Sequence, residues 1–370
     1  MAEKQDGTSP NGILPDHMIG RMIANRQIVM GRDPDHDQIQ PASLDLRLGR
    51  TAYRVRASFL PGAGRTVQDC LKGFSLHEVD IREGAVLETG CVYIVPLLEA
   101  LRLPDHLAAD TNPKSSTGRL DIFTRVIADR ARAFDKIEPG YEGPLYLEIS
   151  PRTFPILVRT GSRLSQIRFR RGLARLDDTA LRDLHAREVL AVGAAPRIDA
   201  GLLVSVDLTG FGETVGFRAR RHASVIDVDR RDACDVLDFW DVLKPQKGGA
   251  LILDPNEFYI LASKEAVHVP PDHAAEMVPF DPLVGEFRVH YAGFFDPGFG
   301  HSAAGGTGSR AVLEVRSREV PFILEDGQTV GRLVYERLAA KPKALYGSGI
   351  GSNYQAQGLK LSKHFRAYSG

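Results

Sequence analysis

Cysteine is scarce in this 370-residue chain, and none of its cysteines has the spacing of a metal-binding pair. Cys70, Cys91 and Cys234 are odd in number and form no CxxC motif, which argues against a disulfide framework and a structural zinc site. No apolar run approaches the ~20 residues that span a bilayer, and the polar N-terminus lacks the apolar core of a signal peptide. We therefore expect a soluble, cytoplasmic protein without a membrane partner.

An excess of charge of either sign is also missing. Lys plus Arg and Asp plus Glu number 47 each, so the overall field does not predict nucleic acid or an anionic membrane as a partner. Any anion-binding site must then be local. With 370 residues, of which 43% are hydrophobic, the chain is long enough for two domains that each have a core.

Two halves of the chain resemble each other and indicate a diverged duplication. The segments YLEISPRTFPILVRTG (146–161) and VLEVRSREVPFILEDG (312–327) match, and other short runs match in the same order. Glu148 and Glu314 are therefore equivalent positions. We predict two homologous domains, residues 1–190 and 191–370.

Within each copy, apolar runs are short, rich in Val, Ile, Leu, Phe and Tyr, and separated by turns rich in Gly, Pro and Asp. This pattern is typical of sandwiches and barrels, and it predicts an all-β fold with a few short helices. One helix is expected from Asp16, as the cap, to Asn25, and another from Asp178 to Leu190.

The polar segment KSSTGR (114–119) is the first candidate site, and it follows Asn112-Pro113, which we expect to form a turn. Its cations and hydroxyl groups suit a phosphate chain, although a solvated polar turn is the alternative. In the second copy, DPLVGE (281–286) keeps the turn and loses every one of these anion ligands. The scaffold alone therefore does not require the residues that define the arm, which are Lys114, Ser115, Ser116 and Arg119.

Glu148 and Glu314 lie in strand-like contexts, where alternation can point them into an apolar pocket. Burial raises the pKa of a carboxyl, as a proton shuttle near neutral pH requires, whereas an outward-facing strand glutamate is the alternative. His106 and His273 are interpreted as turn histidines, because no further metal ligands stand at suitable spacing. Trp240 is interpreted as a core or interface residue of an insertion.

The C-terminal segment 346–365 combines glycines, aromatic residues and amides with Lys360, Lys363 and His364. Segments of this composition often order over a bound phosphate ester as a lid, and a disordered terminus is the alternative. Residues 211–250 are interpreted as an insertion, to which the sequence assigns no role.

In this order, the motifs resemble those of the dCTP deaminases of the dUTP-pyrophosphatase superfamily. QIQPASLDLRLG (38–49) is similar to the family's N-terminal signature, KSSTGR to its phosphate motif, and the segment 137–150 to its hairpin with the catalytic glutamate. Three C-terminal residues fall where the family's lid has two tyrosines and a glutamine, and these are Tyr346, Tyr354 and Gln357. The tandem length resembles a long, two-domain bacterial form of the enzyme.

The resemblance implies two tandem dUTPase-like β-clip domains, which are distorted jelly rolls, and a trimer-like homo-oligomer that shares sites between neighbouring copies. It implies hydrolytic deamination of dCTP to dUTP and ammonia, as a step of dUTP biosynthesis, with dTTP as an inhibitor. A glutamate would activate the water, Mg²⁺ would organise only the triphosphate, and zinc would not be needed. In agreement, the HxE…PCxxC pattern of zinc deaminases is absent from the sequence.

The two copies depart from the family in complementary ways. The family has an alanine shortly before its D-P-G turn, and the second copy matches it with Ala292 and Asp296, whereas the first copy has Phe134 and Glu138. We therefore predict one composite site, with the arm from the first domain and the pocket from the second.

In this site, Glu314 is the catalytic base and Glu148 is a relic or a structural residue. Arg119 is expected to hold Glu314 ionised, and Ser115 to donate to the base or to the water. Lys114 keeps the charge of the family's arginine without its bidentate fork.

Two other functions stay open on this scaffold. A dUTP pyrophosphatase, or a bifunctional enzyme that converts dCTP to dUMP, would use the same fold, and its products would identify it. A non-catalytic nucleotide sensor is the third hypothesis, because the second copy has lost its arm, and binding without product would favour it.

Overall fold

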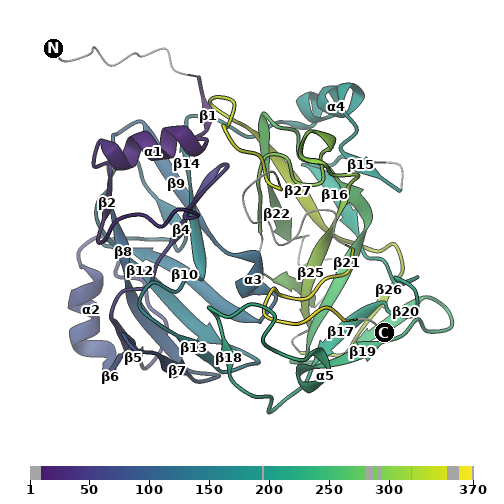
Figure 1. The fold of residues 1–370 in the computed structure, drawn as a ribbon, viewed down its shortest axis with the longest axis horizontal. Helices are drawn as coiled ribbons and strands as arrows, with labels where there is room; N and C mark the ends of the chain where they lie inside the picture. The colour runs from purple at the N-terminus through teal and green to yellow at the C-terminus, as the bar shows by residue number, and fades with distance from the viewer. Residues whose placement is uncertain are drawn as a thin grey trace.

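The computed structural model describes residues 10–193, 196–279, 287–290, 293–317, 319–347 and 358–368. Strands dominate these residues, and the all-β prediction is confirmed. Figure 1 shows the two halves of the chain side by side, the N-terminal half in purple to teal and the C-terminal half in green to yellow. None of the described helices is long and apolar enough to cross a membrane. The helices are α1 (Asp16–Ala24), α2 (Val67–Phe74), α3 (Ser115–Gly118), α4 (Asp178–Arg187), α5 (Val236–Phe239) and the 3₁₀ helix η2 (Ser302–Ala304).

The first half forms two sheets and a small ribbon. One sheet has the order β11-β9-β14-β4-β3, with β1 on β14, and the other has the order β10-β12-β8-β5-β6, with β2 on β8. The strands are β1 (Gly12–Ile13), β2 (Ile28–Met30), β3 (Ile39–Gln40), β4 (Ser43–Leu46), β5 (Thr51–Val55), β6 (Ser75–Asp80), β7 (Ala85–Leu87), β8 (Val92–Arg102), β9 (Leu107–Pro113), β10 (Ile122–Ala128), β11 (Lys136–Ile137), β12 (Glu142–Pro151), β13 (Ile156–Val158) and β14 (Ser165–Arg171).

The second half repeats this pairing. Its sheets have the orders β19-β17-β21-β25-β23, with β15 on β21, and β16-β27-β22-β24, and β20 pairs with β26 as β7 pairs with β13. The strands are β15 (Ala191–Val192), β16 (Leu202–Ser205), β17 (Gly216–Ala219), β18 (Ile226–Asp227), β19 (Trp240–Leu243), β20 (Ala250–Leu253), β21 (Phe258–Val267), β22 (His273–Pro279), β23 (Phe287–His290), β24 (Phe294–Phe295), β25 (Ser309–Ser317), β26 (Phe322–Glu325) and β27 (Thr329–Arg337).

The equivalence of Glu148 and Glu314 is visible in the strand register. Glu148 lies on β12, between Ile94 of β8 and Arg125 of β10. Glu314 lies on β25, between Ile260 of β21 and His290 of β23. Both glutamates therefore occupy the central strand of the same three-stranded arrangement.

The predicted helices are present and shorter than expected. α1 begins at Asp16, which does not cap it; its carboxylate accepts hydrogen bonds from the backbone of Lys343 and Ala344 instead. α4 buries Leu181 and Leu184 in the core of the second half. The domain boundary at residue 190 stays a prediction, and this packing favours a boundary before α4.

The predicted insertion, residues 211–250, has counterparts in the first half, because its strands β17 and β19 take the places of β5 and β6 in the sheet order, and it also connects the two halves. Its strand β18 joins the first half by pairing in parallel with β13. Trp240 is fully buried, with its ring 5.5 Å from Phe154 and 6.1 Å from Phe258, so its interpretation as a core or interface residue is confirmed. His106 lies exposed in a turn, whereas His273 is buried as the first residue of β22 beside Asp272.

Candidate active site

The arm lies at the contact between the two halves, where Figure 1 shows α3 at the centre of the molecule. The backbone N–H of Lys114 and the hydroxyl of Thr117 both donate to the carbonyl of Leu164, at 3.0 and 2.8 Å. The predicted turn at Asn112-Pro113 is wrong, because both residues continue β9 and pair with β14. The arm is thus held by a strand on one side and by the loop before β14 on the other.

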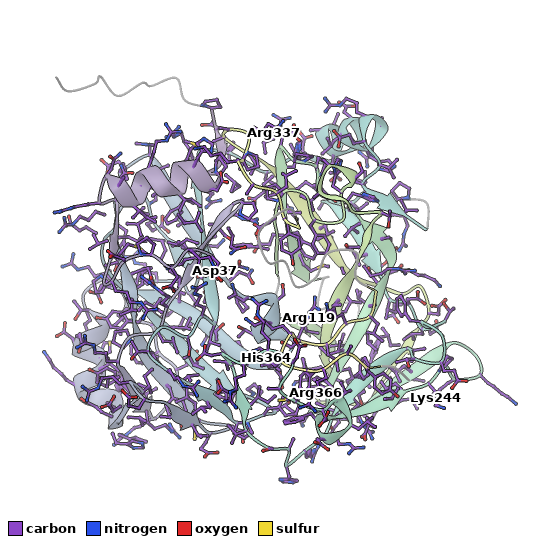
Figure 2. All side chains as sticks on the ribbon, in the orientation of Figure 1. Asp37, Arg119, Lys244, Arg337, His364 and Arg366 are labelled. Atoms are coloured by element: carbon purple, nitrogen blue, oxygen red, sulfur yellow. The ribbon has the colours of Figure 1, made fainter. Side chains whose placement is uncertain are left out.

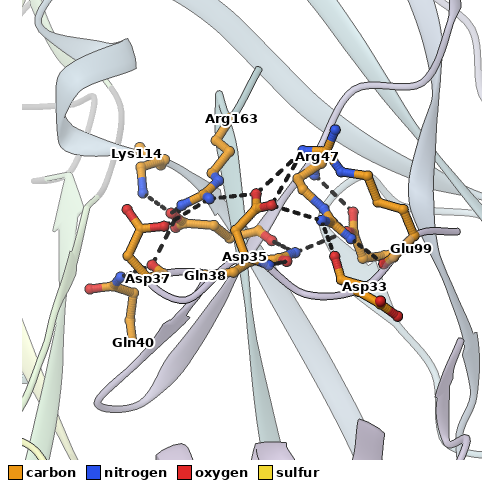
Figure 3. Close-up of polar contacts among 11 residues, drawn as sticks. Asp33, Asp35, Asp37, Gln38, Gln40, Arg47, Glu99, Lys114 and Arg163 are labelled. Atoms are coloured by element: carbon orange, nitrogen blue, oxygen red, sulfur yellow. Dashed lines mark hydrogen bonds and ion pairs between the residues drawn. The ribbon is translucent and has the colours of Figure 1, made fainter. Parts of the chain in front are cut away.

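The ammonium group of Lys114 contacts an acidic network and does not simply project into solvent. Its ammonium forms an ion pair with Asp45, and Arg163 lies 3.5 Å from the same carboxylate, as the close-up in Figure 3 shows. Asp45 belongs to the N-terminal signature, in which Arg47 also binds the buried Glu99 at 2.8 Å. The signature therefore fixes the base of the arm, and Lys114 already has a carboxylate partner.

The pocket glutamate meets the arm at Gly118. The Glu314 side chain lies so close that a Cβ on Gly118 would be 2.8 Å from Oε1 and closer still to Oε2. Glu314 is only 5% exposed, and its Oε2 has no hydrogen-bond partner among the residues that the structure describes. The arm of the first half and Glu314 of the second, both predicted from sequence, thus meet within a single chain.

Burial dominates the electrostatics of Glu314. It raises the pKa of this carboxyl well above its ordinary value, while the nearby Arg119 charge lowers it and the Asp121 charge raises it further. Burial and the Arg119 charge therefore act in opposite directions on the pKa of this carboxyl, and the expectation that Arg119 holds it ionised stays a prediction. A carboxyl with a raised pKa can both take up and release a proton near neutral pH.

The turn at Asp296 forms the next wall of the site. Asp296 is buried, which raises its pKa, and Arg168 opposes this from 3.4 Å away. Arg168 comes from β14 of the first half, donates to the carbonyl of Ala275 at 3.2 Å, and stacks 4.0 Å from the ring centre of Phe294. Sequence reasoning missed Arg168; its only signal was a position between Ile167 and Phe169, in a strand that carries two further arginines.

The remaining predicted residues divide into described and undescribed ones. Ser115 lies on α3, and its Oγ would be 3.9 Å from a Cβ on Gly293 of the second half. Tyr346 donates its backbone N–H to the carbonyl of Pro297, at 2.8 Å, so it lies on the turn that follows Asp296. Three predicted site residues and one segment lie outside the described part of the chain, namely Ala292, Tyr354, Gln357 and 281–286.

The end of the C-terminal segment packs on the arm. Ser362 donates to the carbonyl of Ser116 at 2.8 Å, and Arg119 donates to the carbonyl of Lys360 at 2.9 Å. Figure 2 shows Arg119 and His364 near the centre of the molecule. Residues 358–368 are therefore not a disordered terminus, whereas their role as part of a lid stays a prediction.

The insertion holds this segment in place. The backbone N–H of Ala233 donates to the carbonyl of His364 at 2.9 Å, and the ring of Phe365 packs 5.8 Å from that of Trp240. Burial, with Lys114 and Arg231 nearby, lowers the pKa of Lys363 to about 8. The insertion, whose role sequence left open, thus anchors cationic residues beside the arm.

The pocket of the first half is closed by its own side chains. Arg125 binds Glu148 through two nitrogens, at 2.7 and 3.1 Å, and its guanidinium stacks 3.5 Å from the ring centre of Phe134. Phe134 is the residue that departs from the family's alanine. Within the described part of the chain, no group of three His, Cys, Asp or Glu side chains is arranged to hold a metal ion.

Comparison with known proteins assigns both halves. Residues 10–173 match the family model of the 2'-deoxycytidine 5'-triphosphate deaminase N-terminal domain, and residues 177–365 match that of the C-terminal domain. A crystal structure of 2'-deoxycytidine 5'-triphosphate deaminase from Agrobacterium tumefaciens is 64% identical, with a TM-score of 0.86 over 89% of this chain and 99% of that one.

Single-domain relatives match a smaller part of the chain. The dCTP deaminase of Haloarcula marismortui is 34% identical over 161 residues, which are 42% of this chain and 79% of that protein. A relative from Coprothermobacter proteolyticus, named "dCTP deaminase, dUMP-forming", is 30% identical over 161 residues, which are 42% of this chain and 81% of that protein.

Proposed function

This chain belongs to the dCTP deaminase family, and we propose that it hydrolyses dCTP to dUTP and ammonia at one composite site, with the arm of the first domain and the pocket of the second. The observation that carries the proposal is the approach of the Glu314 carboxylate to Gly118. Two segments that sequence reasoning had assigned to phosphate binding and to base catalysis lie against each other in one chain.

Glu314 acts as the proton shuttle in this proposal. The water gives one proton to Glu314 while its oxygen bonds to C4 of the cytosine, and the carboxyl passes that proton to N3. The same group then carries the remaining hydroxyl proton to the exocyclic nitrogen, the C4–N4 bond breaks, and ammonia leaves. Burial supports this role, because it raises the pKa of Glu314 toward the working pH.

The arm binds the triphosphate in this proposal. Ser115, Ser116 and Arg119 are the anion donors, and Lys114, which is engaged with Asp45, contributes charge at the base of the arm. Cations and hydroxyls suit phosphate oxygens rather than a metal, so Mg²⁺ enters as part of the nucleotide complex. Asp296 and Ala292 would line the nucleoside pocket, and Tyr346, Tyr354 and Gln357 would close over the nucleotide.

Incubation with dCTP and Mg²⁺, with and without a chelator selective for transition metals, tests the proposal. We expect equal amounts of ammonia and dUTP, and the same rate with the chelator, because Glu314 rather than zinc activates the water. A loss of rate that added Zn²⁺ restores would contradict the metal-independent mechanism. Nucleotide binding without any product would favour a sensor.

A second candidate is formation of dUMP. Relatives such as the Coprothermobacter protein carry the name "dCTP deaminase, dUMP-forming". In the same incubation, this activity would release ammonia and pyrophosphate together, whereas a dUTP pyrophosphatase would act on dUTP and leave dCTP unchanged. Inhibition by dTTP, a trimer-like assembly and a cytoplasmic location stay predictions.

A further inference from the structure

A second pair of residues repeats the contact between the arm and the catalytic strand. Arg316 stands two residues after Glu314 on β25, and side chains two apart on a strand point to the same face. Asp121 stands two residues after Arg119. Arg316 and Asp121 form an ion pair. The first half thus contributes the cation Arg119 and the anion Asp121. The second half contributes the anion Glu314 and the cation Arg316.

The first half holds Asp121 firmly. Its backbone N–H donates to the carbonyl of Gly118 at 2.8 Å, and its own carbonyl accepts from the N–H of Arg152 at 3.0 Å. The hydroxyl of Thr153 donates to its carboxylate at 2.5 Å, and the side chain is 1% exposed. Asp121 has a φ of 55°, which aspartate tolerates better than most residues. Its carboxylate is therefore a fixed point directly after the arm.

The second half holds Arg316 as firmly. One guanidinium nitrogen donates to the carbonyl of Asn256, and the other reaches Asp121 and Thr153, the latter at 3.0 Å. The guanidinium lies 5.9 Å from the ring centre of Phe258. Because the side chain is 11% exposed, little solvent screens the ion pair. The pair joins two fixed points across the interface.

The other glutamate strand lacks this device. In the register of β12, the position two residues after Glu148 is Ser150, which pairs with Phe123. The arginine therefore stands only on the strand whose glutamate meets the arm. The shared sheet arrangement by itself therefore does not require the arginine.

We propose that Asp121 and Arg316 are positioning residues of the deaminase, and that their ion pair sets the register in which Gly118 and Arg119 meet Glu314. The inference rests on the proposed function. The Asp121 charge also acts directly on Glu314, whose pKa it raises, and Arg119 is the cation that opposes it. Arg316 and Arg152 are the cations that act on Asp121 itself.

The test is a double-mutant cycle of Asp121→Asn and Arg316→Gln, read as kcat, KM and the pH profile of kcat/KM. A misplacement of about 1 Å in a catalytic constellation costs ~10²-fold, so we expect each single variant to lose about 10–100-fold in kcat/KM, and the double variant to lose less than the product of both. Removing the Asp121 charge lowers the pKa of Glu314, so the acidic limb of the Asp121→Asn profile should move to lower pH.

Arg159 and Asp227 provide the matched control. They form an ion pair at 2.8 Å between the residue directly after β13 of the first half and β18 of the insertion. We expect Arg159→Gln to lower the melting temperature and to leave the acidic limb in place. Additive losses in the cycle together with an unmoved limb would overturn the inference, and a wild-type enzyme without ammonia release would overturn the proposed function instead.

If Asp121→Asn does not fold well, Arg316→Lys provides the second measurement. Lysine keeps the charge and loses the fork that reaches Asn256 through one nitrogen and Asp121 with Thr153 through the other. A positioning role predicts a fall in kcat with an unchanged acidic limb, since the Asp121 charge persists. A wild-type kcat in Arg316→Lys would contradict the proposal, because the lysine cannot make the forked contact of the arginine.

Discussion

The two glutamate pockets of this chain share a strand position and differ in their neighbours. In the first half, Arg125 and Phe134 fill the space in front of Glu148, and the carboxylate is bound by the arginine. In the second half, the Glu314 carboxylate lies against Gly118 of the arm, and its Oε2 has no hydrogen-bond partner among the described residues. A duplicated strand therefore yields a structural ion pair in one copy and a candidate base in the other.

The comparison shows that the side chains around each glutamate, rather than the glutamate itself, decide whether it is a structural residue or a candidate base. Buried polar atoms usually have hydrogen-bond partners, so an unsatisfied carboxylate oxygen in a conserved topology points to a group reserved for a ligand. Glu148 has an oxygen without a partner as well, but the other oxygen accepts both contacts from Arg125. In the first pocket, Arg125 therefore already holds the carboxylate that a base would need.

The largest expected effect separates the two glutamates by activity. Glu314→Gln should lower kcat by at least ~10²-fold, because the amide cannot shuttle a proton, and losses of a positioned acid–base group reach ~10⁴-fold. Glu148→Gln should keep activity within a few-fold. Steady-state ammonia release from both purified variants measures this.

The control for this pair is folding. Both variants should bind dCTP and give the melting profile of a folded protein, since each substitution changes one atom of a side chain. An active Glu314→Gln enzyme together with an inactive Glu148→Gln enzyme would reverse the assignment of the two pockets.

A smaller effect concerns the space between the arm and the base. Gly118→Val places a branched side chain where the Glu314 carboxylate lies, so the carboxylate must move, and we expect a loss of ~10²-fold in kcat. Gly73→Val is the matched control, because a Cβ on Gly73, in α2, meets no atom within 4 Å. Equal activity of both variants would show that Glu314 does not work from this position.

Much of this arrangement was predictable from sequence. Alternating apolar runs identified the strands, and the ordered matches between the halves identified Glu148 and Glu314 as equivalent residues. The departure at Phe134 indicated which pocket was closed. Local patterns suffice for these features, since each depends on residues close together in the chain or on a comparison between copies.

The contacts across the interface were not predictable in this way. Arg168 pairs with Asp296 over 128 positions, and Arg316 pairs with Asp121 over 195. A charged residue in a strand is usually solvent-exposed, so the sequence around either arginine does not indicate a buried partner in the other half. The pKa shift of Glu314 depends on burial and on the charges of Arg119 and Asp121 from the other half, which local sequence patterns do not reveal.

The smallest expected effect compares the two glutamates by stability, and its sign should be opposite in the two pockets. Glu148→Gln weakens the ion pair with Arg125, whose side chain is 26% exposed, so we expect a loss of about 1–3 kcal/mol rather than the larger cost of breaking a fully buried pair. Urea unfolding at neutral pH should show a lower midpoint than wild type.

Glu314→Gln should raise that midpoint at neutral pH. The folded state raises the pKa of Glu314 above its unfolded value of about 4.3, so the contribution of this carboxyl to stability is complete below that pH and declines as pH rises through the folded pKa. The glutamine avoids the decline, and its advantage over wild type should shrink as the pH falls toward 4. A midpoint below wild type at pH 8 would mean that the ionised carboxylate is stabilised in the folded enzyme, and Arg119 would then outweigh burial after all.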